Sequence, residues 1–258
     1  MRIQGRTAVV TGGAAGIGRA AAVALARKGA AKVVLVDIDD AGMAETVRQV
    51  EAEGASGAAR RVDLSDLSAL AAGFEALQAE GGYDILYNNA GVVSGGRQFP
   101  TAGAGQIGFV MTVNLLAPIL ATEIAARGMQ ARGGGVIVNT ISTVALGQGF
   151  SDALYASSKA GLQMFNRCCA SLKDSHKVRV AGVLPGLTDT PILHKTGDGK
   201  AADWMAPILA GYAKCRPEDI AEAVIQLIED DSLAGGDWVA VRNVEGRIER
   251  EWGHDTVA

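Results

Sequence analysis

The chain has 258 residues, 48% of them hydrophobic and 20% charged, which is a globular composition with ample material for a buried core. The formal net charge is −4, and the 24 basic and 28 acidic residues are spread along the sequence without a basic block, so no nucleic-acid-binding surface is expected. There is no run of about 18 uninterrupted apolar residues, so we expect no membrane span.

Short apolar runs alternate with longer helical patterns along the chain. The runs are rich in Val, Ile and Ala, and they predict seven strands: Thr7–Thr11, Lys32–Asp37, Ala58–Val62, Ile85–Asn88, Gly135–Ile141, Val178–Leu184 and Asp237–Val241. The periodicity between them predicts helices near residues 17–28, 41–53, 66–79, 106–130, 153–173 and 217–229. This alternation indicates an α/β fold, a doubly wound, seven-stranded, mostly parallel sheet with helices on both faces. Nothing resembles an interdomain linker, so residues 1–258 are predicted to form one domain.

A glycine-rich turn follows the first predicted strand. Thr11 is followed by Gly12, Gly16 and Gly18, and a helical pattern begins at once. Glycines let backbone N–H groups approach a pyrophosphate, and the start of a helix adds unpaired donors and a positive dipole. A plain strand-to-helix turn is the alternative, but the position between a strand and a helix favours a dinucleotide site of the Rossmann type.

The second predicted strand ends at Asp37, 19 residues after Gly18. A carboxylate at this place accepts hydrogen bonds from adenosine ribose hydroxyls and repels a 2′-phosphate. Residues 38–40 include no basic side chain that would bind such a phosphate. These features predict NAD, not NADP, as the cofactor.

Tyr155 and Lys159 lie four residues apart in a helical pattern, so both face the same side of the helix. A tyrosine has an ordinary pKa near ~10, and a neighbouring ammonium is expected to lower this pKa enough for general acid–base chemistry. Ser142 stands 13 residues before Tyr155, where the fifth predicted strand ends, and its hydroxyl is suited to bind a carbonyl oxygen. A core tyrosine and a polar strand end are the ordinary alternatives for these residues taken singly.

Together these motifs resemble the short-chain dehydrogenase/reductase family, and the resemblance runs through nearly the whole chain. The matching motifs are Thr-Gly-x3-Gly-x-Gly at 11–18, Asp37, Asp63, Asn-Asn-Ala-Gly at 88–91, Asn114, Ser142, Tyr155, Lys159 and Pro-Gly-x3-Thr at 185–190.

The resemblance implies a catalytic set of Ser142, Tyr155, Lys159 and Asn114. In this set Tyr155 is the general acid in carbonyl reduction and the general base in alcohol oxidation, while Ser142 holds and polarises the substrate oxygen. Lys159 lowers the pKa of the tyrosine and binds the nicotinamide ribose. Asn114 interrupts its helix and holds a water that links Lys159 to solvent.

The resemblance also implies a set of cofactor contacts. Asp63 and Asn89 are expected to frame the adenosine half, and Thr190 to contact the nicotinamide carboxamide. The predicted cofactor-binding residues are Gly12, Gly16, Ile17, Gly18, Asp37, Ile38, Asp63, Leu64, Asn89, Ala90, Gly91, Tyr155, Lys159, Pro185, Gly186, Thr188 and Thr190.

Within the family, the segments 227–231 and 235–239 are most similar to the 15-hydroxyprostaglandin dehydrogenase branch. This similarity favours NAD and an apolar alcohol. The chain departs from that branch three residues before Tyr155, where Asp152 replaces a glutamine, so prostaglandin is not the expected substrate.

Residues 190–212 are predicted to form a substrate lid within the domain. Trp204, Ile208 and Tyr212 have the spacing of one apolar helix face, which favours an apolar substrate and disfavours an anion. The alternative is that this face simply packs on the edge of the sheet. The predicted substrate residues are Ser142, Asp152, Ile192, Trp204 and Ile208.

The sequence thus predicts a NAD-dependent oxidoreductase that interconverts a secondary alcohol and a ketone. The alternatives are a NADPH-dependent carbonyl reductase and a non-catalytic regulatory protein that binds a nicotinamide cofactor. The helices at 106–130 and 153–173 are apolar beyond one face, which predicts a homodimer or homotetramer. The three histidines are scattered and suggest no metal site, and three cysteines without disulfide spacing indicate a reduced, cytoplasmic protein.

Overall fold

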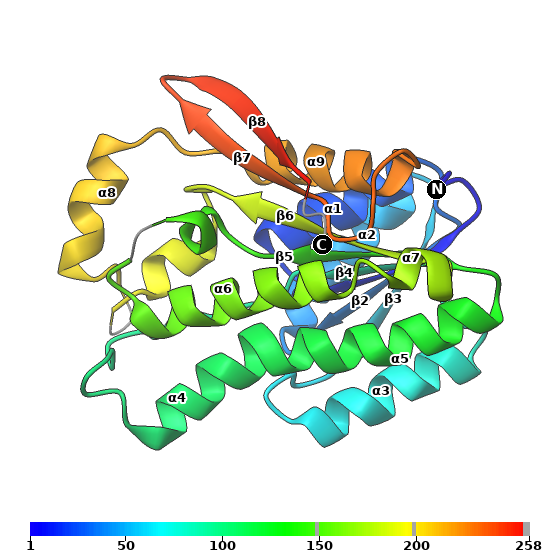
Figure 1. Ribbon diagram of the computed structural model, residues 1–258, viewed down its shortest axis with the longest axis horizontal. Coiled ribbons are helices and arrows are strands. Elements are labelled where there is room, and N and C mark those ends of the chain that lie inside the picture. The colour runs from blue at the N-terminus through cyan, green and yellow to red at the C-terminus, as the bar shows by residue number, and fades with distance from the viewer. Residues whose placement is uncertain (148–149, 198–199, 255–258) are drawn as a thin grey trace.

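The computed structural model describes residues 1–147, 150–197 and 200–254. Within these residues one sheet contains the strands β1 (Thr7–Thr11), β2 (Lys32–Asp37), β3 (Ser56–Arg61), β4 (Ile85–Asn88), β5 (Gly135–Thr140), β6 (Val178–Pro185), β7 (Trp238–Val244) and β8 (Arg247–Gly253). Their order is β3-β2-β1-β4-β5-β6-β7-β8 (Figure 1). Strands β1 to β7 pair in parallel, and β8 runs antiparallel to β7. The predicted doubly wound, mostly parallel sheet is confirmed.

Helices cover both faces of this sheet (Figure 1). They are α1 (Gly16–Arg27), α2 (Asp40–Ala52), α3 (Leu67–Ala79), α4 (Gly103–Met111), α5 (Ala117–Ala131), α6 (Ala153–Cys168), α7 (Leu172–Ser175), α8 (Ala206–Gly211) and α9 (Pro217–Glu229). Helices α1, α2 and α9 lie on one face, and α3, α5 and α6 lie on the other.

Successive side chains of each central strand point to opposite faces of the sheet, so each strand contributes to two hydrophobic cores. Val10 and Leu35 pack towards α1 and α9, whereas Val9 and Val34 pack towards α3 and α5. Because both faces are covered, β4, β5 and β6 are buried along their whole length, which explains their continuous apolar sequences.

The predicted helix at 106–130 consists of three parts: α4, a π-helical turn at Thr112–Leu116, and α5. Pro118 has no N–H to donate to the carbonyl of Asn114 four residues earlier, so the α-helical pattern is interrupted there. The whole segment Gly103–Ala131 is long and apolar enough to cross a membrane by length and composition alone. It is a core helix, because residues such as Ile124 and Met129 are buried against the sheet.

Strand β8 is absent from the predicted set of seven strands. It follows a two-residue turn, Glu245–Gly246, in which both residues have positive φ, at 51° and 86°. Such a turn matches the twist of an antiparallel hairpin. The strand sequence, Arg247–Gly253, contains more charged than apolar residues, so it lacks the apolar alternation from which a strand is predicted.

The described residues of the segment 190–212 form short helical pieces and no long helix. A 3₁₀ turn spans Pro191–Lys195, a second spans Asp203–Met205, and α8 follows directly. Positions 198 and 199 of the predicted lid lie outside the described residues. In Figure 1, α8 and the β7–β8 hairpin lie on the same side of the molecule, beyond the carboxyl ends of the strands.

Candidate active site

A cavity of about 1310 Å³ lies at the carboxyl ends of the parallel strands. Its walls come from the glycine turn after β1, the ends of β2, β4, β5 and β6, the start of α6, parts of the stretches 190–196 and 205–213, and the β7–β8 turn. Open α/β sheets bind their ligands at this edge, where loops from several strands converge.

The glycine turn has no room for side chains. A Cβ on Gly18 would lie 2.1 Å from the carbonyl oxygen of Gly12, and a Cβ on Gly12 would lie 2.9 Å from the Cα of Ala90. Gly16 has a φ of 55°, a conformation that other residues rarely adopt. The backbone of the turn can therefore approach a ligand closely, although Gly18 itself packs beneath the cavity and does not line it.

The start of α1 faces the cavity without a side-chain cap. Its N-cap residue is Ala15, and no side chain accepts hydrogen bonds from the first turn. Asn89 holds the turn in place by donating to the carbonyl oxygens of Thr11 (3.1 Å) and Gly12 (3.3 Å). Uncapped N–H groups, a helix dipole and a glycine cradle fit the pyrophosphate of a dinucleotide.

Asp37 lies at the end of β2, on the cavity wall. One of its oxygens accepts a hydrogen bond from the N–H of Ala14 (3.0 Å), and the other accepts from Ile38 (2.7 Å) and Asp39 (3.1 Å). These bonds fix the carboxylate against the glycine turn. Asp63 lines the same end, where hydrogen bonds from the hydroxyl and the N–H of Ser65 lower the pKa of its carboxyl.

One basic residue near this end was not predicted. Arg61 is paired in register with Asp37 across β3 and β2, and its guanidinium contacts Asp40 (2.9 Å) and the carbonyl of Ile38. Residues 38–40 and Ala15 before Gly16 offer no basic side chain, whereas strand pairing brings Arg61 beside Asp37. The register between β2 and β3 is a feature of the tertiary structure that the local sequence does not reveal.

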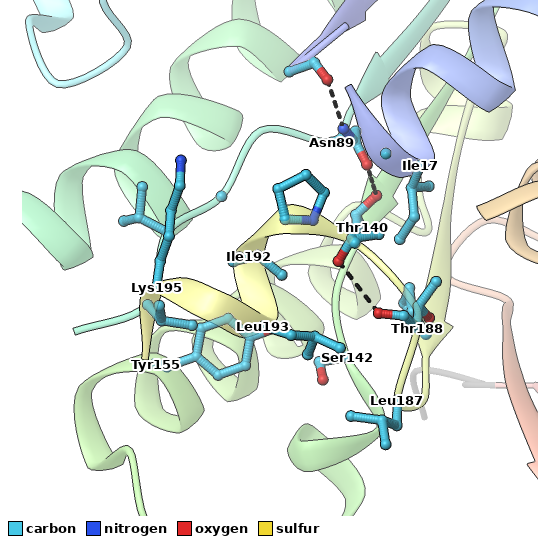
Figure 2. Close-up of a pocket in the computed structure, with 18 of the residues that line it drawn as sticks. Ile17, Asn89, Thr140, Ser142, Tyr155, Leu187, Thr188, Ile192, Leu193 and Lys195 are labelled. Atoms are coloured by element: carbon cyan, nitrogen blue, oxygen red, sulfur yellow. Dashed lines mark hydrogen bonds between the residues drawn. The ribbon is translucent and has the colours of Figure 1, made fainter. Parts of the chain in front are cut away.

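Tyr155, Ser142 and Lys159 meet at the opposite end of the cavity. Figure 2 shows Tyr155 beside Ser142, close to Ile192 and Leu193. Burial raises the pKa of Tyr155, while its hydrogen bond with Ser142 lowers that pKa and the charge of Asp152 raises it. The ammonium of Lys159 lies 5.8 Å from the centre of the tyrosine ring.

Lys159 is 3% exposed, and its Nζ donates to the carbonyl oxygen of Thr140 at 2.7 Å. Burial lowers the pKa of Lys159 to about 8. The net shift of the Tyr155 pKa is upward, because taking the phenolate out of water is its largest cause. The lowering of this pKa by Lys159 stays a prediction.

Asn114 lies at the centre of the π-helical turn, as expected from its helix interruption, and does not line the cavity. Its Oδ1 accepts from the N–H of Val92 (2.8 Å), and its Nδ2 donates to the carbonyl of Val92 (2.8 Å) and to the hydroxyl of Ser158 (3.1 Å). Asn114 therefore joins the loop after β4 to the helix that carries Tyr155.

Two of the predicted substrate residues, Asp152 and Trp204, do not line the cavity. Asp152 is fully buried as the N-cap of α6, so it faces no substrate. Trp204 does not line the cavity but packs edge-on against Phe150, with ring centres 5.3 Å apart. Phe150, whose ring centre is 6.3 Å from that of Tyr155, lies on the cavity wall in its place.

The remaining predicted residues line the cavity: Gly12, Gly16, Ile17, Asp37, Ile38, Asp63, Leu64, Asn89, Ala90, Gly91, Ser142, Tyr155, Lys159, Pro185, Gly186, Thr188, Thr190, Ile192 and Ile208. The sequence did not predict Phe150, Leu187, Met205 or the β7–β8 turn as parts of the wall. An apolar residue in a loop gives no sequence signal that separates a ligand contact from ordinary packing.

The sheet topology and the cavity at its carboxyl edge define a Rossmann-type α/β protein. Residues 6–201 match the family described as short chain dehydrogenase, and the chain belongs to this family.

Curated relatives include enzymes of different names. The chain is 37% identical over 190 residues to the probable oxidoreductase EphD of Mycobacterium tuberculosis, a match that covers 73% of this chain but only 32% of EphD. It is 35% identical over 230 residues to the cis-4-hydroxycyclohexanecarboxylate dehydrogenase of Sinomonas cyclohexanicum, covering 87% and 90% of the two chains. It is 33% identical over 237 residues to the D-xylose 1-dehydrogenase of Caulobacter vibrioides, covering 89% and 91%.

Solved structures with the same fold include levodione reductase, with a TM-score of 0.83 and 26% identity over 94% of this chain and 98% of that one. Another is a putative NAD(P) dependent gluconate 5-dehydrogenase from Beutenbergia cavernae with bound NADP. Its TM-score is 0.80, with 32% identity over 90% of this chain and 93% of that one.

Proposed function

We propose that this protein is a NAD-preferring oxidoreductase that interconverts a secondary alcohol and a ketone on a small, apolar substrate. The observation that carries the proposal is the convergence of Ser142, Tyr155 and Lys159 on one cavity, whose other end contains Asp37 and the uncapped start of α1. The dehydrogenase and reductase names among its relatives support the same class of reaction.

Each polar residue at the reacting end has a distinct role in this proposal. When bound, the nicotinamide would supply the hydride chemistry. Tyr155 would donate its proton to the oxygen of a ketone, or accept the proton of an alcohol hydroxyl in the reverse direction. Ser142 would polarise that oxygen. Lys159 would bind the nicotinamide ribose, and Asn114 would hold a water that links Lys159 to solvent.

Two alternatives compete with this proposal. A NADPH-dependent carbonyl reductase is favoured by the NADP bound to one solved relative and by Arg61, but Asp37 would repel the 2′-phosphate. A regulatory protein that only binds the cofactor would need the glycine turn and Asp37. It would have no use for Ser142, Tyr155 and Lys159 at the other end.

The wall around the reacting end is mainly apolar, with Phe150, Leu187, Ile192, Met205 and Ile208. This lining suits an alkyl, cycloalkyl or aryl alcohol better than a sugar. One curated relative takes its name from a hydroxylated cyclohexane ring and another from a pentose, so the names of the relatives point in both directions.

We expect kcat/KM for alcohol oxidation with NAD⁺ to rise with the apolar surface of the substrate, by up to roughly 0.8 kcal/mol per buried methylene. A series of 2-alkanols, cyclohexanol, 4-hydroxycyclohexanecarboxylate and D-xylose, followed by the absorbance of reduced nicotinamide, tests this expectation. Because Trp204 supports Phe150, Trp204→Ala should raise KM for the bulky alcohols more than for the small ones. Faster turnover of xylose or small hydroxy acids would contradict the apolar substrate.

The segment 190–212 is proposed to act as a lid that excludes water from the hydride path. Ile192 and Ile208 come from its two halves, and both line the cavity. The similarity of the segments 227–231 and 235–239 to the 15-hydroxyprostaglandin dehydrogenase branch stays a prediction. The relatives described above carry the names of other enzymes. A cytoplasmic location is proposed on the cysteine usage alone.

A dimer, or a tetramer made of two dimers, is the proposed assembly. The outer surface of α4, the π-helical turn and α6 exposes Ile107, Phe109, Leu116 and Met164, between 41% and 56% of each side chain. Burying these side chains against a second copy would remove apolar surface from water. Sedimentation at micromolar concentration should therefore give a species of at least twice 26.5 kDa, and a 26.5 kDa monomer would contradict the proposal.

A further inference from the structure

The carboxylate of Asp152 is buried beside the reacting end of the cavity without lining it. It accepts hydrogen bonds from the N–H of Ser94 (2.8 Å), the hydroxyl of Ser94 (2.5 Å) and the N–H of Tyr155 (3.1 Å). All three donors are neutral, so they stabilise the carboxylate without cancelling its charge. Burying a charge in this way is costly, and the start of a helix is the place where the cost for an anion is lowest.

These bonds connect two parts of the site. Asp152 caps α6 at its first turn, three residues before Tyr155. Ser94 belongs to the loop after β4, whose residues Gly91, Val92 and Val93 line the cavity. The loop is held from its other side by Asn114, so Asp152 and Asn114 fix it between two helices.

Few charged side chains lie around Tyr155 in the described part of the chain, although Lys195 lines the same cavity. The elements that pack against α6 include α4, the π-helical turn and the 3₁₀ turn Thr143–Leu146, and these three carry no charged side chain. Strand β6 carries Arg179, but its guanidinium donates to the carbonyls of Leu227 and Ile228. On α6 itself the charges close to Tyr155 are those of Lys159 and of the cap Asp152.

The two charged groups close to Tyr155 have opposite signs. Burial lowers the pKa of Lys159 to about 8. The carboxylate of Asp152, buried three residues before Tyr155, raises the pKa of the tyrosine. Asp152 therefore opposes the phenolate, the form of Tyr155 that alcohol oxidation needs.

We propose that Asp152 is a positioning residue that orients Tyr155 and, through its buried carboxylate, sets the pH range in which this tyrosine can accept a proton. The proposal rests on the role of Tyr155 in the proposed function. With the charge in place, the protonated phenol is favoured, which suits proton delivery to a ketone at neutral pH and moves alcohol oxidation to alkaline pH.

Asp152→Asn removes the carboxylate charge but keeps the helix cap, because asparagine caps helices about as well as aspartate. In the Asp152→Asn enzyme, the apparent pKa seen in the pH dependence of kcat/KM for alcohol oxidation should fall by about one unit relative to wild type. This is the scale of the effect of one nearby charge. Asp152→Ser, another capping residue without charge, should shift it in the same direction. Unchanged pH profiles in soluble, folded variants would overturn the proposal.

The matched control is Asp66→Asn at the N-cap of α3, where Asp66 accepts from the N–H groups of Ser68 and Ala69. This variant should lose similar stability and keep the wild-type pH profile. A direct readout is the phenolate absorbance of the cofactor-free protein on alkaline titration, with Tyr155→Phe subtracted, which should appear at lower pH in Asp152→Asn. If Tyr155→Phe turns over substrate normally, the proposed function fails; if only the Asp152 shift is missing, this inference alone fails.

Discussion

Tyr155→Phe is expected to lower kcat by about 10²- to 10⁴-fold while leaving the affinity for NAD(H) nearly unchanged. The substitution removes the hydroxyl that would exchange a proton with the substrate oxygen and keeps the ring that packs beside Phe150. Steady-state kinetics with the best alcohol, together with a titration of NADH binding by fluorescence, measures the two effects separately.

Lys159→Ala is the informative companion, because Lys159 is proposed to touch the cofactor and to influence Tyr155. It should weaken both turnover and NADH binding, whereas Tyr155→Phe weakens turnover alone. A Tyr155→Phe enzyme with near wild-type kcat would remove the assignment of the acid–base group and favour the non-catalytic alternative.

NAD(H) is expected to be preferred over NADP(H) by on the order of a hundredfold in kcat/KM. Asp37 is held against the glycine turn by three backbone N–H groups, so it cannot move away from a 2′-phosphate without breaking them. Kinetics with both cofactors and one alcohol tests this preference directly. Equal kcat/KM values for the two cofactors would contradict it.

Arg61 supplies the control for that measurement, because it is the basic side chain paired in register with Asp37. Its guanidinium is engaged by Asp40, which weakens any attraction for a phosphate. If Arg61 nevertheless assists NADP binding, Arg61→Ala will increase the preference for NAD. If Asp40 neutralises it, the preference will stay unchanged.

The sequence predicted the order and type of the main elements because their signals are local. Continuous apolar runs specify buried parallel strands, whereas the helix interruption at Asn114, where the π-helical turn lies, was implied by the family resemblance. The residues of the glycine turn, Asp37, Ser142 and Tyr155 were found for the same reason: each belongs to a short motif attached to one element. Apart from Gly18, they line the cavity, and their roles there stay predictions.

The features that the sequence did not predict depend on contacts between segments that are distant in the chain. Asp152 was interpreted as a substrate residue because it stands three positions before Tyr155, but capping turns its side chain inward towards Ser94. Trp204 was placed on the cavity wall by helical spacing, whereas a 3₁₀ turn directs it against Phe150. The pKa of Tyr155 depends on burial, which no sequence spacing measures.

The eighth strand also bears on whether neighbouring molecules can join through the edges of their sheets. Without β8, the apolar strand β7 would leave a row of unpaired N–H and C=O groups at the end of the sheet, a template for edge-to-edge aggregation. Strand β8 takes over that edge with Arg247, Glu249, Arg250 and Glu251 among its seven residues. At the opposite edge β3 ends in Arg60 and Arg61. Charged side chains at both edges discourage the sheets of neighbouring molecules from joining, so the hairpin whose turn lines the cavity also disfavours self-association through its strands.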